Sequence, residues 1–224
     1  MNRIPVNNIF AAVFEKSVLD PLLDVLDKKS VRFWGTVGTV KYLTSKGFSA
    51  HSVVRGFDFD GRVKSLDRGI FARILADRTK KNHLSQLRVI ARSEATKQSD
   101  PGKRSLRFAR DDKAYTSDVK SGLRLESTSE VKEAAPFDLV VVTLYELDKK
   151  NFPESMDIGG QALIRAAIKN YKNVALAFDE KSINEVTAEI KKNDGSTTIE
   201  FRKTQAKLAL EFIAERSRLE SSLK

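Results

Sequence analysis

The chain has 224 residues and a formal net charge of +10, and this length suits one α/β domain with a sizeable core and some extra material. It has no cysteine and only two histidines, which excludes disulfides, thiolate metal sites and cysteine nucleophiles and leads us to expect no metal. No apolar run approaches membrane-spanning length, and the N-terminus lacks a basic-then-apolar signal, so we expect a cytoplasmic protein without a membrane partner.

The first predicted elements lie between residues 31 and 55. Residues 31–34 are expected to form a strand, residues 35–39 a turn, and residues 40–46 a short helix that ends at Gly47. A weaker strand is predicted at 51–55.

Further apolar runs alternate with helical patterns, which predicts a parallel sheet with crossover helices. The continuous Val and Leu run at 137–144 is typical of a strand covered on both faces, and 174–178 is a second such strand. A surface helix is expected at 182–193. The final helix is expected to begin at a capping box in which Thr197 precedes Glu200 by three residues.

The segment DIGGQALIRAAIKNY at 157–171 joins a carboxylate, a glycine pair and two cations. Gly159 and Gly160 let the backbone approach a ligand and leave free N–H groups at a helix start, where negative charge is favoured. Arg165 and Lys169 are four residues apart and share one helical face. Because like charges at this spacing weaken an isolated helix, the pair favours a bound anion or a nearby carboxylate. The pattern indicates an anion-binding and proton-handling site. The alternative is that Asp157 only caps the helix while both cations are solvated.

Three segments together resemble one known family: GRVKSL at 61–66, FDLVVVTLY at 137–145, and the 157–171 segment. From about residue 11 to the C-terminus the chain resembles the IMP cyclohydrolase domain of the bifunctional AICAR formyltransferase/IMP cyclohydrolase family. The glycine pair followed by the Arg-Ala-Ala and Lys-Asn helix is the most specific match. The formyltransferase domain is expected to be absent.

The resemblance implies an α/β fold, a three-layer Rossmann-like domain of the methylglyoxal-synthase-like type with a mostly parallel central sheet. We expect one domain over residues 1–224, interrupted at about 79–135 by a surface insertion. The sequence at 88–113 is similar to a translated palindromic repeat. It has eight Lys or Arg against four Asp or Glu and so contributes much of the net positive charge. Such an insertion costs little if its ends stay close, because loop-closure entropy grows slowly with length. A functional basic arm is the alternative interpretation.

The activity that the resemblance implies is dehydrative ring closure of 5-formamidoimidazole-4-carboxamide ribotide (FAICAR) to IMP, without a metal or organic cofactor. Lys64, Tyr145, Asp157 and Lys169 match the family's catalytic residues. The positions that match substrate contacts are Thr36, Gly38, Thr39, Arg62, Ser65, Gly159, Gly160 and Arg165. In an open parallel sheet these segments would meet outside the carboxyl ends of the strands.

Several positions depart from the family pattern. Ala12 and Phe14 stand where the family has two serines, and Thr143 stands where it has an asparagine. Val37 replaces a loop glycine, and a branched side chain there would be costly if the backbone needed positive φ. The lost hydroxyls predict weaker substrate affinity than in a typical member.

A fold shared by a cyclohydrolase, a lyase and a regulatory module does not identify the chemistry, so alternatives stay open. One is a catalytically degenerate nucleotide-binding or regulatory module of the same fold. Another is methylglyoxal synthase, although that lyase lacks the 157–171 helix pattern. Nucleic-acid binding would suit the charge, but the chain has no basic stripe interleaved with aromatic residues. The resemblance implies a homodimer, and a separately encoded formyltransferase, as candidate partners.

Overall fold

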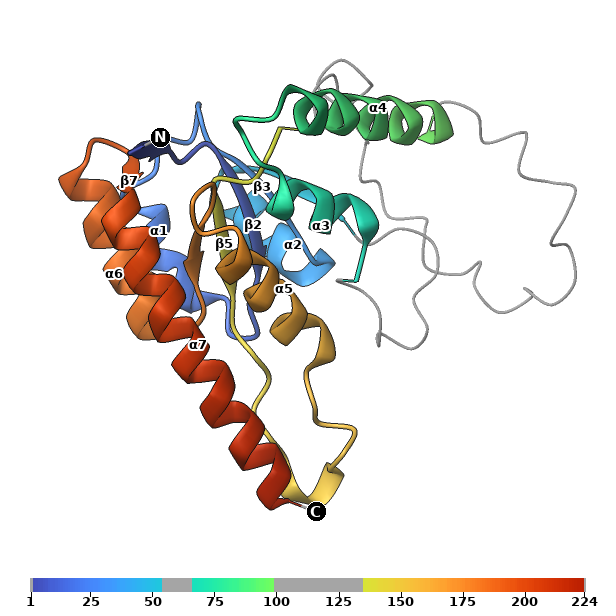
Figure 1. The fold of residues 1–224 in the computed structure, drawn as a ribbon, viewed down its shortest axis with the longest axis vertical. Coiled ribbons are helices and arrows are strands. Elements are labelled where there is room, and N and C mark those ends of the chain that lie inside the picture. Colours follow the sequence, from blue (N-terminus) through green and yellow to red (C-terminus); the bar gives the residue numbers. More distant parts are fainter. Residues whose placement is uncertain (1, 54–65, 99–134, 224) are drawn as a thin grey trace, which may run out of the picture.

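The computed structural model describes residues 2–53, 66–98 and 135–223. Its centre is a five-stranded parallel sheet in the order β4-β3-β2-β5-β6 (Figure 1). The strands are β2 (Asn8–Ala12), β3 (Arg32–Gly35), β4 (Ser49–Ser52), β5 (Leu139–Val142) and β6 (Ala175–Ala177). The α/β class and the parallel sheet expected from the sequence are confirmed.

Both faces of the sheet are covered, and the strand sequences explain why. All four residues of β5, Leu-Val-Val-Val, are buried, as expected for a parallel strand with helices on each side. Alternate side chains of β2 enter different clusters, with Ile9 packing on one face and Phe10 on the other. The result is a three-layer architecture.

Six of the described helices form the two outer layers. On one face lie α1 (Asp20–Leu23), α2 (Val37–Ser45) and α6 (Glu180–Lys192), whose buried side chains share a cluster with Ile9. On the other face lie α3 (Arg68–Leu75), α5 (Ile158–Lys169) and α7 (Ile199–Ser222), which pack with Phe10. Figure 1 shows α7 running the length of the molecule, with its C-terminal end close to the segment that leads into α5.

The remaining elements are short or peripheral. Helix α4 (Lys81–Gln98) packs beside α3, and η1 (Ser17–Leu19) and η2 (Lys149–Asn151) are single 3₁₀ turns. Strands β1 (Arg3–Pro5) and β7 (Ser196–Thr198) form a separate antiparallel pair. Within the part of the chain that the structure describes, no helix is long and apolar enough to cross a membrane.

The turn predicted at 35–39 was wrong. Most of it is the first turn of α2, which begins at Val37 after Thr36 as N-cap. The only non-glycine residue with positive φ in the described ranges is Asp194, so the backbone strain considered for Val37 does not arise. Helix α2 is followed by Gly47 at φ 85°, a left-handed conformation that glycine adopts readily after a helix.

The final helix begins one residue later than the predicted capping box. Its N-cap is Thr198, whose side chain accepts a hydrogen bond from the Phe201 backbone N–H at 3.3 Å. Thr197 is instead fully buried in β7, and its carbonyl oxygen accepts a hydrogen bond from Nη1 of the buried Arg202 at 2.6 Å. Tertiary contact therefore overrides the local capping pattern here.

The two ends of the predicted insertion are tied to the body by a buried ion pair. Arg78, one residue before the predicted start, pairs through Nη2 with Asp138 and donates from Nε to the Asn173 carbonyl at 2.9 Å. Asp138 also accepts hydrogen bonds from the backbone N–H groups of Asn7 and Asn8, at 2.9 and 2.7 Å. The residues just before and just after the predicted insertion are therefore held close together. Residues 99–134 of the insertion lie outside the described residues.

Candidate functional site

Polar and aromatic residues gather at the carboxyl edge of the sheet, where parallel strands bring their following loops together. Phe14 follows β2, Thr36 follows β3, and Tyr145 follows β5. Asp157 is the N-cap of α5 at the same edge. We call these four residues the carboxyl-edge site.

Asp157 holds two backbone groups at once. Its Oδ1 accepts a hydrogen bond from the Gly160 N–H at 2.6 Å, which satisfies a free donor of the first helical turn. Its Oδ2 accepts a longer bond, 3.4 Å, from the N–H of Tyr145. The residue is only 9% exposed. Asp157 is therefore a helix cap, as the simpler interpretation expected, and it also joins α5 to the segment after β5.

Burial raises the pKa of Asp157 above the ordinary value of a carboxyl group. The hydrogen bonds from Gly160 and Tyr145 oppose this shift, as does the positive charge of Arg216, whereas the charge of Glu220 adds to it. Within the described elements, desolvation is the largest effect. A carboxyl group with a raised pKa is better matched to proton transfer near neutral pH than an exposed one.

Gly160 is required at its position because the chain packs against it closely. A Cβ there would lie 2.5 Å from Cδ2 of Leu144 and 2.7 Å from Oδ2 of Asp157. Gly38, in the first turn of α2, is exposed, and a Cβ there would meet only Lys16 at 3.7 Å. The two glycines therefore offer a matched comparison.

We expect Gly160→Ala to lower the free energy of unfolding by about 1–3 kcal/mol, because the methyl group must displace Asp157 or Leu144. Gly38→Ala should raise it by about 0.5–1 kcal/mol, because alanine favours the helix. Urea unfolding of both variants measures this difference. Equal stability of the two variants would contradict the packing described for Gly160.

Thr36 and Thr39 form a local pair at the start of α2. Their hydroxyl oxygens lie 3.2 Å apart. Thr39 is fully buried, so its hydroxyl supports Thr36 and does not face solvent. Of the three residues matched to the substrate by resemblance at this turn, Thr36 and Gly38 are the ones with solvent access.

The two aromatic rings of the carboxyl-edge site are exposed and contact each other. Phe14 is 58% exposed and Tyr145 is 55% exposed, and their ring centroids lie 5.4 Å apart in an edge-to-face arrangement. The Phe14 N–H donates to Oγ1 of Thr143 at 2.9 Å, and its carbonyl accepts from Nζ of Lys16. Two departures from the family pattern, Phe14 and Thr143, are therefore in direct contact.

Lys169 lies away from these residues. Asp157 caps the start of α5 and Lys169 is its last residue, so twelve residues at 1.5 Å each separate them by about 18 Å. A lysine side chain cannot span that distance. The expectation that Asp157 and Lys169 share one crevice is thus corrected for a single chain. The four-residue spacing places Arg165 and Lys169 on one face of the helix, but it does not place Lys169 near the end that Asp157 caps.

Arg165 and Lys169 are both exposed on α5, and within the described residues neither forms an ion pair. Gly159, in the first turn of α5, is buried beside Gly160. Arg62, Lys64 and Ser65 lie outside the described residues, between β4 and α3.

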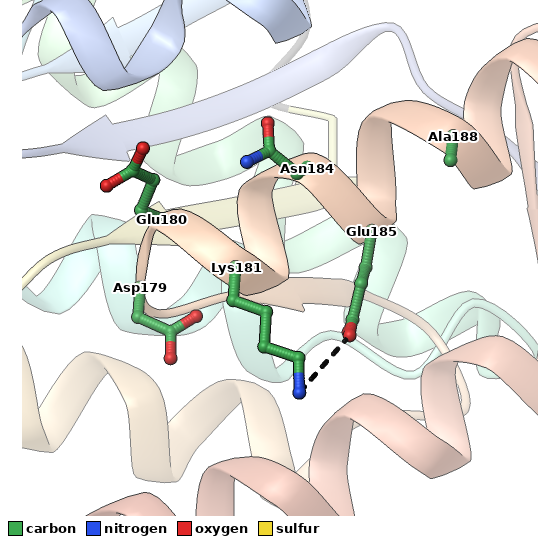
Figure 2. A pocket seen from close by; sticks show the side chains of 6 residues that line it. All are labelled: Asp179, Glu180, Lys181, Asn184, Glu185 and Ala188. Atoms are coloured by element: carbon green, nitrogen blue, oxygen red, sulfur yellow. Dashed lines mark ion pairs between the residues drawn. The ribbon is translucent and has the colours of Figure 1, made fainter.

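Two further kinds of site, a metal centre and a pocket, would be visible among the described residues. No group of three or more His, Asp or Glu within the described ranges is arranged to hold a metal ion. A hollow of about 740 Å³ lies along α6. Figure 2 shows its lining, which includes Asp179, Glu180 and an ion pair between Lys181 and Glu185 at 4.0 Å. Its carboxylates would repel a phosphate, and it contains none of the predicted site residues.

Sequence reasoning missed the residues of α7 that contact the carboxyl-edge site. Arg216 donates from Nη2 to the carbonyl of Tyr145 at 2.7 Å. Glu220 accepts a hydrogen bond from Gln161 of α5 at 2.7 Å. No local pattern indicates a contact between residues 71 positions apart in the sequence.

Comparison with known proteins agrees with this architecture. No protein-family model matches the chain. The bifunctional purine biosynthesis protein PurH of Natranaerobius thermophilus is 29% identical over 223 residues, covering 94% of this chain and 35% of that protein. PurH of Clostridium kluyveri is 30% identical over 213 residues, covering 90% of this chain and 34% of its own length.

A solved structure, that of ForH, superimposes with a TM-score of 0.65 at 21% identity, covering 97% of this chain and 98% of ForH. At that identity the likeness shows the fold alone. The chain spans about a third of the length of the PurH proteins that it matches. The resemblance seen in the sequence motifs is therefore confirmed, and the chain is a divergent relative of the PurH proteins.

Proposed function

We propose that this chain is an IMP cyclohydrolase, which closes the ring of FAICAR to give IMP and water in de novo purine biosynthesis. The observation that carries the proposal is the Asp157 carboxyl group, desolvated at the start of α5 and bonded to the backbone of Tyr145. The kinship with proteins named for purine biosynthesis supports it.

Ring closure joins the carboxamide nitrogen of the substrate to its formyl carbon, and the formyl oxygen leaves as water. The two hydrogens of that water come from the carboxamide nitrogen and the formamide nitrogen. A catalyst must therefore hold the two groups together and move protons from nitrogen to oxygen. Correct orientation alone can lower such a barrier by about 7–11 kcal/mol.

In this proposal Asp157 accepts the proton of the attacking carboxamide nitrogen and passes it on. Its raised pKa suits both steps. Lys64 is assigned, by resemblance, to the developing negative charge on the formyl oxygen. Tyr145 would orient the carboxamide, because its ring is exposed and its backbone N–H is bonded to Asp157.

The ribotide phosphate is assigned to the start of α2. The free N–H groups of a first helical turn favour an anion, and no acidic residue lies in the first turn of α2. Thr36 and the exposed Gly38 are at this turn, with the Lys16 side chain beside them. Phe14 would contact the planar base, which places an apolar ring where the family has a hydroxyl.

The assay that tests the proposal follows the absorbance of purine formation from synthetic FAICAR with wild type, Lys64→Ala and Asp157→Ala. We expect wild type to accelerate IMP formation and both variants to lose most of the rate. Equal rates in all three proteins would contradict the proposal.

The second candidate is a module that binds a nucleotide without turning it over. The exposed Phe14, in place of a family serine, favours it, because a phenyl ring supplies no hydrogen bond to the substrate. Isothermal titration with IMP separates the candidates. Binding without turnover would favour the module, whereas turnover would exclude it.

The position of Lys169 adds a requirement to the proposal. If Lys169 serves the same reaction as Asp157, it must come from a second copy of the chain, because the two lie at opposite ends of α5. We therefore propose a homodimer in which Lys169 of one copy completes the site of the other. This is the candidate homodimer implied by the family resemblance.

Mixing two inactive variants tests this arrangement. We expect Asp157→Asn and Lys169→Ala to be inactive alone, and their equimolar mixture to regain about a quarter of wild-type activity, since half the dimers are mixed and each has one intact site. The mixed dimer is verified by native mass spectrometry. A mixed dimer that forms but stays inactive would show that Lys169 does not act across an interface.

A further inference from the structure

The C-terminal part of α7 contacts the segment that carries Tyr145. Nη2 of Arg216 donates a hydrogen bond to the Tyr145 carbonyl oxygen at 2.7 Å. Nε of the same guanidinium lies 3.3 Å from Oε1 of Glu220, and the two side chains are only 11% and 10% exposed. A buried ion pair at the end of a long helix is costly unless its geometry is satisfied, and here both partners have further bonds.

Glu220, the second partner of this ion pair, also contacts the start of α5. Oε1 of Glu220 also accepts a hydrogen bond from Nε2 of Gln161, at 2.7 Å. Gln161 follows Gly160, whose N–H is bonded to Asp157. One continuous set of contacts therefore joins α7, the cap of α5 and the backbone of Tyr145.

This set of contacts acts on both functional groups of the carboxyl-edge site. The N–H of Tyr145 points to Asp157 while its carbonyl is held by Arg216, so the residue is fixed from both sides. The charges that act on Asp157 from the described elements are those of Arg216, which lowers its pKa, and Glu220, which raises it. The two act in opposite directions from one helix.

We propose that Arg216 is a positioning residue, which reaches from α7 to hold the Tyr145 backbone against Asp157, with Glu220 and Gln161 orienting its guanidinium. Its effect on turnover rests on the proposed cyclohydrolase activity. Its effect on the Tyr145 segment and on Asp157 does not. The two can therefore be tested separately.

The test compares Arg216→Gln, Arg216→Lys and Glu220→Gln with Arg218→Gln in the full chain. Arg218 is the matched control, because it is an exposed arginine on the same helix whose ion pair with Glu215, at 2.9 Å, involves no site residue. Amide hydrogen exchange of residues 143–148 reports the anchoring. A carbon-13 NMR titration of Asp157 reports the electrostatics, and FAICAR kinetics report the catalytic consequence.

We expect exchange at residues 143–148 to accelerate in Arg216→Gln and to match wild type in Arg218→Gln. The pKa of Asp157 should rise in Arg216→Gln and fall in Glu220→Gln, a pair of opposite shifts that general destabilisation would not produce. The value of kcat should fall by up to about a hundredfold in Arg216→Gln, since a small misplacement of reacting groups has that effect. In Arg216→Lys the positive charge remains, so it should still lower the pKa of Asp157, but part of the anchoring should be lost.

Arg216→Gln indistinguishable from Arg218→Gln in exchange and in the Asp157 titration would overturn the proposal. If wild type proves inactive on FAICAR while the exchange and titration results are as expected, the proposed activity fails and the positioning role stands. Normal kcat in Arg216→Gln with accelerated exchange would refute the catalytic part of the role.

Discussion

Asp157→Asn is expected to lower the rate of IMP formation by about 10²- to 10⁴-fold while leaving the fold intact. Asparagine is as good an N-cap as aspartate, so its side-chain oxygen can still accept the Gly160 N–H. The amide cannot accept the proton of the attacking nitrogen. Kinetics and urea unfolding of the same preparation measure the two effects.

Asp157→Ala is the paired variant, because it removes both the cap and the carboxyl group. It should lose activity and, in addition, about 1 kcal/mol of unfolding free energy. If Asp157→Asn retained wild-type activity, the carboxyl group would be a helix cap only, and its burial would have no catalytic meaning.

The largest effect on stability is expected for Asp138→Ala, about 3–5 kcal/mol less unfolding free energy. This carboxylate is nearly fully buried and pairs with Arg78. It also accepts the backbone N–H groups of Asn7 and Asn8, next to the central strand β2. Its removal leaves the Arg78 guanidinium without its carboxylate and two partly buried backbone N–H groups without their acceptor. Chemical denaturation followed by Trp34 fluorescence measures the change.

Lys181→Ala is the control for Asp138→Ala. It also breaks an ion pair, with Glu185 at 4.0 Å, but on the exposed face of α6. The expected loss is less than about 1 kcal/mol, because surface pairs gain little over solvation. Similar losses for the two variants would mean that the Arg78 and Asp138 pair does not anchor the sheet.

Local sequence patterns identified the architecture but not its centre. The sequence predicted β3, β5 and β6 from their apolar runs, and the end of α2 from the glycine that follows it. Both are local signals, because burial and helix termination each leave a pattern in the sequence. The middle strand β2, Asn8–Ala12, was not predicted as a strand. This strand has only five residues and begins with a polar side chain, so its hydrophobic periodicity is weak. Its pairing with β3 and β5 is a tertiary property, which the local sequence does not reveal.

The candidate site was predictable where its functional residues lie close together in one segment of the sequence or directly follow an evident strand. Asp157 and its glycines are such a case, and Tyr145 follows an evident strand. Lys169 shows the limit, because helical spacing identifies a face whereas a site at the sheet edge depends on which end of the helix a residue occupies. Arg216 shows another, because its contact with Tyr145 depends on how α7 packs across α5.

The most direct test of the account is an amide NMR titration of the chain with IMP. If the carboxyl edge is the nucleotide site, the amides of Thr36, Tyr145 and Gly160 shift with increasing ligand, and those of Glu185 and Ala188 in the hollow of α6 stay unchanged. Shifts confined to α6, with an unresponsive Gly160 amide, would contradict it.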